Sequence, residues 1–194
     1  MKVLVTGAGG FIGSKLCKKL ISEGYEVYGI IHNNPSKAEG IQIINADLTK
    51  NDFVIPDVKF DAVFHLAAAT PLVKDKKKQK RINYEGTVNL FEKIKDKTNF
   101  IIYASGLGVF GNPKGIVNEQ SLMQPDTDFV KIRLEAQRFL EDSCKNNNIG
   151  FSVCYFGDVY GDGSWFTEMV VKKLKSGMMK VPGKGDYEKC FIHV

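Results

Sequence analysis

VTGAGGFIG, residues 5–13, places Gly7, Gly10 and Gly13 at the spacing G-x-x-G-x-x-G, between an apolar run and a helical pattern. Glycine at these positions permits the tight turn out of a strand, a close approach of the backbone to a pyrophosphate, and close packing of helix on sheet. The N-terminus of the following helix offers free N–H groups and partial positive charge to phosphates. The stretch therefore predicts a phosphate-binding loop, with Gly7, Gly10, Phe11, Ile12 and Gly13 as its contacts.

The rest of the chain alternates short apolar runs with amphipathic stretches. The runs are almost continuously apolar, as in buried parallel strands covered on both faces; they are residues 2–6, 26–31, 41–46, 62–67, 100–105 and 151–156. The helical patterns between and after them are residues 13–24, 84–95, 133–145 and 165–177. This order predicts an α/β fold, a Rossmann-type doubly wound parallel sheet with helices on both faces.

Composition narrows the class of protein. Of the 194 residues, 43% are hydrophobic and 25% charged, which is typical of a water-soluble globular domain. We expect a cytoplasmic protein without a membrane partner, because no apolar run is long enough to span a bilayer and the N-terminus lacks a signal-peptide pattern. The four cysteines are scattered and no histidine cluster accompanies them, so we expect reduced thiols and no metal site.

The formal charge is +5, and much of the basic excess lies in KDKKKQKR, residues 74–81. Such a run is usually a solvated face, and we interpret it as electrostatic background. It could also attract a phosphate-bearing ligand or nucleic acid. No nucleic-acid-binding motif accompanies it, so nucleic acid is not expected as a partner.

The choice of dinucleotide depends on the end of the second strand. A carboxylate about 20 residues after the glycine loop would bind the ribose hydroxyls of NAD. The sequence instead holds His32, Asn33 and Lys37, and the first carboxylate is Glu39. An uncharged or cationic environment tolerates a 2′-phosphate, which favours NADP. The alternative, that Asn33 hydrogen-bonds the hydroxyls of NAD, stays open.

Several motifs resemble those of the extended short-chain dehydrogenase/reductase family, the NAD-dependent epimerase/dehydratase group. TGAGGFIG, NYEGTVNL, YASGLGVFG, GDVYGDG and the final IHV occur in the family's order, and PGKGDYEKC before IHV is similar to its G-x-G stretch. By resemblance, ADL at 46–48 supplies Asp47 and Leu48 to the adenine ring. HLAAA at 65–69 passes under the cofactor, with Leu66, Ala67 and Ala68 as contacts. His65, at the strand end, is interpreted as packed or cofactor-adjacent rather than as a base.

The resemblance also implies catalytic positions. In the family a tyrosine and, four residues later, a lysine transfer the proton, with a serine or threonine orienting the substrate oxygen. The matching residues here are Phe129, Arg133 and Gly106, and Ser105 lies one position before the last of these. Ser105, Phe129 and Arg133 are therefore the catalytic candidates, and Arg133 is also a cofactor contact. Phe129 has no ionisable group and cannot act as acid or base, whereas a guanidinium can still donate hydrogen bonds to a ribose.

Two functions are compatible with these residues. One is an NAD(P)-dependent epimerase, dehydratase or reductase that acts on a nucleotide sugar; the other is a non-catalytic sensor or carrier of the dinucleotide. We expect residues 1–160 to form the NAD(P)-binding domain and residues 161–194 to begin a substrate-binding lobe, which either belongs to a longer chain or is reduced. The expected partner is a small-molecule substrate, and a homodimer is left open.

Overall fold

The structure is a computed structural model, and it describes residues 1–35, 39–113, 115–177 and 190–194. Lys37 and most of the PGKGDYEKC stretch lie outside the described residues. The chain divides into two compact units, Met1–Tyr155 and Phe156–Val194, so the division falls five residues before the expected boundary. That the second unit begins a substrate-binding lobe stays a prediction.

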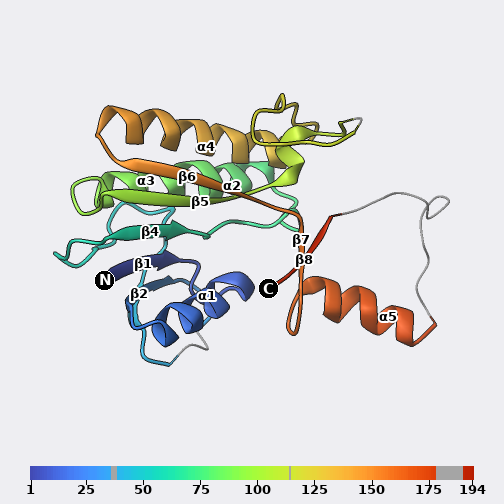
Figure 1. The fold of residues 1–194 in the computed structure, drawn as a ribbon, viewed down its shortest axis with the longest axis horizontal. Coiled ribbons are helices and arrows are strands. Elements are labelled where there is room, and N and C mark those ends of the chain that lie inside the picture. The colour runs from blue at the N-terminus through green and yellow to red at the C-terminus, as the bar shows by residue number, and fades with distance from the viewer. Residues whose placement is uncertain (36–38, 114, 178–189) are drawn as a thin grey trace. The chain divides into compact units, whose positions relative to one another are not determined.

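The first unit is built on a six-stranded sheet of order β3-β2-β1-β4-β5-β6 (Figure 1). All the pairings recorded between β1, β2, β3, β4 and β5 are parallel. The strands are β1 (Lys2–Thr6), β2 (Glu26–Ile31), β3 (Gln42–Asn45), β4 (Ala62–His65), β5 (Phe100–Gly106) and β6 (Gly150–Phe156). All six lie within one residue of their predicted starts, which confirms the predicted Rossmann-type fold.

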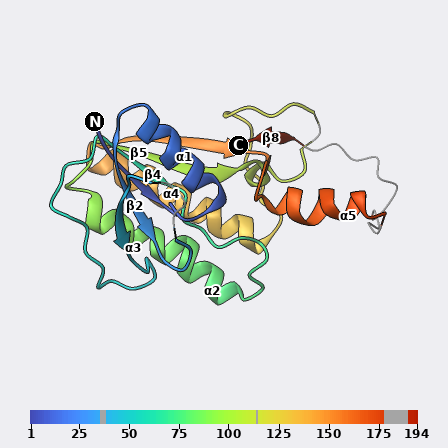
Figure 2. The same ribbon diagram turned by 90° about the horizontal axis from the view of Figure 1, so that it is seen from below.

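Helices cover both faces of this sheet. In Figure 2, α1 (Phe11–Ser22) lies on one side of the strands, and α3 (Gly86–Ile94) on the other. The second side also carries α4 (Asp128–Asn146), which begins at the N-cap Thr127, whose hydroxyl accepts from the N–H of Val130. Two separate apolar clusters fill the faces, because successive residues of a strand point to opposite sides. Val3 and Val5 of β1 pack toward α1, and Leu4 between them packs with the α3 and α4 side.

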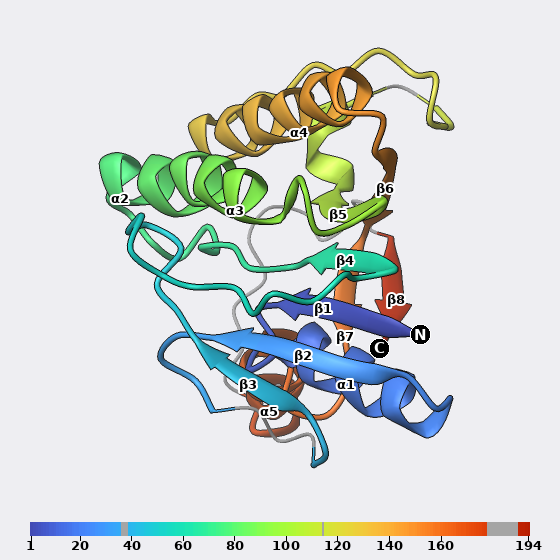
Figure 3. The same cartoon turned by 90° about the vertical axis from the view of Figure 1, so that its left-hand side faces the viewer.

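One continuous helical segment was only partly predicted. It runs through α2 (Lys76–Lys80), the π-helical turn Arg81–Glu85 and α3, and Figure 3 shows it passing along α4. Its first part is the lysine run, and Asp75 caps it by accepting hydrogen bonds from the N–H groups of Lys77 and Lys78. The run is therefore helix rather than loop. A short 3₁₀ turn, Leu107–Phe110, follows β5.

The second unit holds a two-stranded parallel ladder of β7 (Asp158–Tyr160) and β8 (Phe191–His193). A helical stretch between them consists of a π turn, Phe166–Val171, and α5 (Lys172–Lys175). Ring contacts join Tyr160 to Phe166, Phe191 and His193. Among the described residues of both units, no helix is long and apolar enough to cross a membrane.

Candidate functional site

A cavity of about 800 Å³ opens where the parallel strands end. The segments after β1, β2, β3 and β4 line it, as expected for a ligand site at the carboxyl edge of such a sheet. Nine of the predicted cofactor contacts meet here: Gly7, Gly10, His32, Asn33, Asp47, Leu48, Leu66, Ala67 and Ala68. Three further predicted contacts do not line the cavity and lie in the first turn of α1: Phe11, Ile12 and Gly13. The three catalytic candidates do not line the cavity either.

The glycine loop is packed so closely that side chains would not fit. Gly7 has a φ of +69°, and a Cβ there would lie 3.0 Å from the amide nitrogen of Ala67. A Cβ on Gly13 would lie 2.1 Å from the carbonyl oxygen of Gly7. Gly10 is the N-cap of α1, and no side chain caps that helix end. The first-turn N–H groups therefore have no side-chain acceptor and are available to a phosphate, as the predicted dinucleotide requires.

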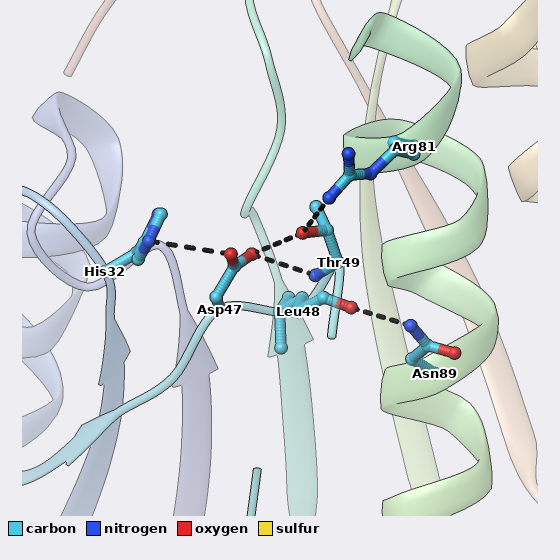
Figure 4. Close-up of polar contacts among 6 residues, drawn as sticks. All are labelled: His32, Asp47, Leu48, Thr49, Arg81 and Asn89. Atoms are coloured by element: carbon cyan, nitrogen blue, oxygen red, sulfur yellow. Dashed lines mark hydrogen bonds and ion pairs between the residues drawn. The ribbon is translucent and has the colours of Figure 1, made fainter. Parts of the chain in front are cut away.

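Asp47 is held in a defined orientation after β3 (Figure 4). Its Oδ1 accepts hydrogen bonds from the N–H and the hydroxyl of Thr49, at 3.0 and 2.8 Å. Nε2 of His32 lies 3.8 Å from its Oδ2. Partial burial would raise the pKa of Asp47, but the hydrogen bonds from Thr49 and the nearby His32 hold it below its ordinary value. The cavity therefore contains a fixed carboxylate, able to accept a hydrogen bond from a ligand.

The segment that carries Asp47 and Leu48 is tied to α3. Nδ2 of Asn89 donates to the carbonyl oxygen of Leu48 at 2.9 Å, as Figure 4 shows. A Cβ on Gly86 would meet Cβ of Leu48 at 3.3 Å, so glycine lets the segment lie against the helix. Asn89 and Gly86 belong to the NYEGTVNL motif. Their contacts with Leu48 give a physical reason for asparagine and glycine at these two positions of the motif.

A buried polar chain fixes the segment after β4. Thr87 Oγ1 donates to the carbonyl of Asn83 and lies 2.8 Å from Nε2 of His65, while Nδ1 of His65 lies 2.8 Å from Thr6 Oγ1. Thr6 Oγ1 in turn accepts from the N–H groups of Leu66 and Ala67. These partners assign the proton of neutral His65 to Nε2.

Burial, assisted by the charge of Arg133, lowers the pKa of His65 to about 3. The imidazole is fully satisfied and neutral near pH 7. It is therefore a packed histidine that positions the segment Leu66–Ala67, as the sequence indicated, and not a base that faces the cavity.

Asn83 is a buried residue behind the cavity wall that was not among the predicted site residues. It is 0% exposed, and its Oδ1 accepts from the N–H of Ala69, which lines the cavity. Its Nδ2 is buried and has no hydrogen-bond partner among the described residues. An unpaired buried donor is costly, but Asn83 does not line the cavity, so its contribution there is to hold the backbone of Ala69. The asparagine of NYEGT was the available signal.

The catalytic candidates are engaged with the protein itself. Nη2 of Arg133 donates a hydrogen bond to the carbonyl oxygen of Ala104, and the guanidinium lies over the Tyr103 ring. Its Nη1 is buried and unpartnered among the described residues. The hydroxyl of Ser105, which is 7% exposed, donates to Oε1 of Gln137 on α4 at 3.0 Å. Phe129 is half-buried in the first turn of α4.

Two nearby tyrosines are buried or half-buried. Burial raises the pKa of Tyr103, against the opposing charge of Arg133, and the Tyr103 hydroxyl donates to the carbonyl of Arg133 at 3.3 Å. Tyr155 has a pKa raised by burial and accepts a hydrogen bond from Gln137. Neither tyrosine lines the cavity. Among the described residues, no group of three or more His, Cys, Asp or Glu side chains could hold a metal ion.

The parallel sheet, the glycine loop and the cavity at the strand ends define a Rossmann-type protein. The chain belongs to the NAD dependent epimerase/dehydratase family, whose model matches residues 3–194, and thus to the extended short-chain dehydrogenase/reductase group. That Phe129 and Arg133 occupy the family's tyrosine and lysine positions stays a prediction.

Individual relatives agree with this assignment. The chain is 29% identical to ADP-L-glycero-D-manno-heptose-6-epimerase of Brachyspira hyodysenteriae over 82% of its own length and 55% of that protein. It is 31% identical to UDP-glucose 4-epimerase of Mycolicibacterium smegmatis over 72% of its length and 50% of that protein. It thus spans about half the length of these two relatives.

A solved structure gives the same result. The UDP-glucuronic acid 4-epimerase of Bacillus cereus, in complex with UDP-glucuronic acid and NAD, is 27% identical with a TM-score of 0.84. The match covers all of this chain and 69% of that one.

Proposed function

We propose that this chain binds a nicotinamide dinucleotide in the cavity at the ends of β1, β2, β3 and β4. The observation that carries the proposal is the glycine loop, whose close packing leaves the uncapped N-terminus of α1 beside the cavity. Asp47 supplies a fixed acceptor, and Asn83 holds the backbone of the cavity-lining residue Ala69. The dinucleotide would accept or donate a hydride; the residues named here would bind and orient it.

Both forms of the cofactor fit the residues at the end of β2. The cavity lining there consists of His32, Asn33 and Asn34, none of which repels a 2′-phosphate. The family model is named for NAD, and the Bacillus cereus neighbour was solved with NAD. These matches give no support to the expected preference for NADP. We therefore propose NAD or NADP, with selectivity set by Asn33 and by the cationic residues of the cavity.

The substrate class follows from the relatives. The epimerases of Mycolicibacterium smegmatis and Bacillus cereus are named for UDP sugars, and the Brachyspira protein for an ADP sugar. A nucleotide sugar is accordingly the proposed small-molecule partner.

A second candidate function, dinucleotide binding without turnover, is favoured by the state of the three catalytic positions. Phe129 offers no exchangeable proton, and Ser105 is hydrogen-bonded to Gln137. The guanidinium of Arg133 supplies positive charge and hydrogen-bond donors but no acid–base group like the family's phenol. Its Nη1 is buried, and Arg133 does not line the cavity. The usual phenol and ammonium pair is thus absent from the sequence, and a carrier or sensor fits what is left.

A thermal-shift titration with NAD, NADH, NADP and NADPH tests the proposed binding. A ligand at about 100 times its Kd stabilises a folded protein by roughly 2.7 kcal/mol, which gives an easily measured increase in Tm. A single-turnover assay with UDP- and ADP-sugars, monitored at the absorbance of the reduced nicotinamide, then separates the two functions. Saturable stabilisation without hydride transfer indicates a carrier or sensor. No stabilisation by any of the four dinucleotides would refute the proposed function.

A further inference from the structure

Residues 76–81 of the lysine run form α2 and the first residue of the π turn, and their charges divide between two faces. On one face, Nζ of Lys76 lies 2.9 Å from Oδ2 of Asp128, and Nζ of Lys80 lies 3.6 Å from Oε1 of Glu135. Both carboxylates belong to α4. Lys76 and Lys80 are four residues apart, one helical turn, and they pair with α4 as surface ion pairs.

The other face carries Lys77, Lys78 and Arg81, which all line the dinucleotide cavity. Within the part of the chain that the structure describes, none of these three forms an ion pair with a carboxylate. Asp75 lies beside them, but its Oδ1 accepts the N–H groups of Lys77 and Lys78 as the helix cap. The positive charge on the cavity wall therefore exceeds the negative charge of the two carboxylates there, Asp75 and Asp47.

Arg81 connects this wall to the fixed carboxylate of the cavity. Its Nη2 lies 3.4 Å from Oγ1 of Thr49, and the same hydroxyl donates to Asp47, so Arg81, Thr49, Asp47 and His32 form one row (Figure 4). Arg81 is exposed, and its remaining N–H groups are free to donate to a ligand. A guanidinium so placed matches the bidentate geometry of phosphate oxygens.

We infer that Lys77, Lys78 and Arg81 form a phosphate subsite on the wall that α2 and the π turn contribute to the cavity. The subsite holds a phosphate group of the bound dinucleotide, which the glycine loop alone does not neutralise. This inference rests on the proposed function and deepens it, because it assigns binding roles to residues outside the glycine loop. Two groups have the required chemistry: the pyrophosphate common to NADH and NADPH, and the adenosine 2′-phosphate found only in NADPH.

The test compares two variants that lose the same charge from the same helix. Lys77→Gln/Lys78→Gln removes two charges from the cavity face, and Lys76→Gln/Lys80→Gln removes two from the α4 face. A third variant, Arg81→Gln, tests the guanidinium. NADH and NADPH are titrated by nicotinamide fluorescence at low and at physiological salt, and Tm confirms that each variant folds.

We expect the cavity-face pair to weaken binding roughly two- to thirtyfold at low salt, since each exposed charge contact contributes about 0.2–1 kcal/mol. The control pair should change the Kd less than twofold. Equal loss for NADH and NADPH identifies the pyrophosphate as the group held, and loss confined to NADPH identifies the 2′-phosphate. The effect should shrink as salt screens the contact.

Two results would overturn the inference while leaving the proposed function intact. Equal weakening by both double variants would show that only the overall charge matters. Unchanged Kd values in the cavity-face pair and in Arg81→Gln would show that these residues do not touch a phosphate. Failure of the unmodified protein to bind either dinucleotide would instead refute the proposed function and the inference together.

Discussion

The guanidinium carbon of Arg133 lies 4.6 Å from the centroid of the Tyr103 ring, and the same guanidinium donates to the carbonyl of Ala104. Arg133 is thereby packed over the end of β5 by a cation–π contact and a charge-assisted hydrogen bond. Its Nη1 has no partner among the described residues. The guanidinium of Arg133, the residue predicted at the family's lysine position, is thus held by the protein itself.

Restoring the family's pair should restore acid–base chemistry. In the double variant Phe129→Tyr/Arg133→Lys the phenol and ammonium would stand one helical turn apart on α4. The ammonium stabilises phenolate and so lowers the pKa of the phenol. We expect hydride transfer from a nucleotide sugar roughly 10²–10⁴ times faster than in the unmodified protein. Stopped-flow absorbance of the nicotinamide measures it.

The single variant Phe129→Tyr is the control for that experiment. It supplies the phenol while Arg133 keeps its contacts with Ala104 and Tyr103, so we expect a smaller gain. Robust turnover by the unmodified protein would contradict the second candidate function, a carrier or sensor, because Phe129 has no proton to transfer. It would mean that this family member uses another acid–base group.

Cofactor selectivity should respond to charge at the end of β2. Asn33 lines the cavity, and Asn33→Asp would place a carboxylate where a 2′-phosphate would approach. We expect the affinity for NADPH to fall about tenfold or more, and the affinity for NADH to change little. Isothermal titration calorimetry with both dinucleotides gives the ratio.

Asn99→Asp is the matched control, since Asn99 precedes β5 at the opposite end of the sheet and does not line the cavity. It adds the same charge to the protein. If both substitutions shifted the NADPH affinity equally, Asn33 would have no specific role in selectivity.

The buried imidazole of His65 should make the fold sensitive to acid. Its folded pKa is about 3, below the ordinary value of about 6.5 that applies in the unfolded chain. Between these values only the unfolded state binds the proton, so stability decreases as pH falls from about 6.5 toward 3. Each pH unit in that window contributes about 1.4 kcal/mol to the free energy of unfolding. Above pH 6.5 this contribution is constant.

Urea unfolding at several pH values between 4.5 and 7.5 measures this dependence. His65→Gln keeps polar atoms near Thr6 and Thr87 but removes the titration, so its stability should vary less with pH. A pH slope identical to that of the unmodified protein would show that His65 is not the group responsible.

Substitution of Ser105 distinguishes a structural role of its hydroxyl from a catalytic one. Its hydroxyl donates to Gln137 in the interior, and Gln137 also donates to the Tyr155 hydroxyl. Ser105→Ala should therefore lower the free energy of unfolding by about 1–3 kcal/mol, because a buried acceptor loses its donor. The Kd for NADH should not change, since Ser105 does not line the cavity. A weaker Kd at unchanged Tm would instead favour the catalytic assignment.

Much of the fold could be predicted from local pattern. The residues 2–6 and 26–31 match β1 and β2 because buried parallel strands must be apolar on both faces. The lysine run was different, since it has no apolar periodicity that predicts a helix. Its helix depends on the cap at Asp75 and on continuation into α3, neither of which the charges reveal. β7 and β8 were missed because three-residue strands pair over 30 residues apart.

The residues of the candidate site also divide into those that the sequence predicts and those that it does not. Gly7 and Gly10 could be found because backbone geometry demands glycine at fixed spacing. Thr6 could not, because its role arises from burial and from partners distant in the sequence. Arg81 reaches the cavity through its place on a helix face, which no motif records.

The most direct test of the proposed dinucleotide site is the Kd of NADH for the unmodified protein and for Gly10→Val, measured by calorimetry. A Cβ on Gly10 meets only the carbonyl oxygen of Gly7 within 4 Å, at 3.1 Å, so the methyl groups of valine would project into the space intended for the pyrophosphate. Ser14→Val, one turn further along α1 and outside the cavity lining, is the control.

We predict one-site binding by the unmodified protein and by Ser14→Val, and a Kd at least tenfold weaker in Gly10→Val with its circular dichroism unchanged. Equal affinity in all three proteins would contradict binding at the glycine loop.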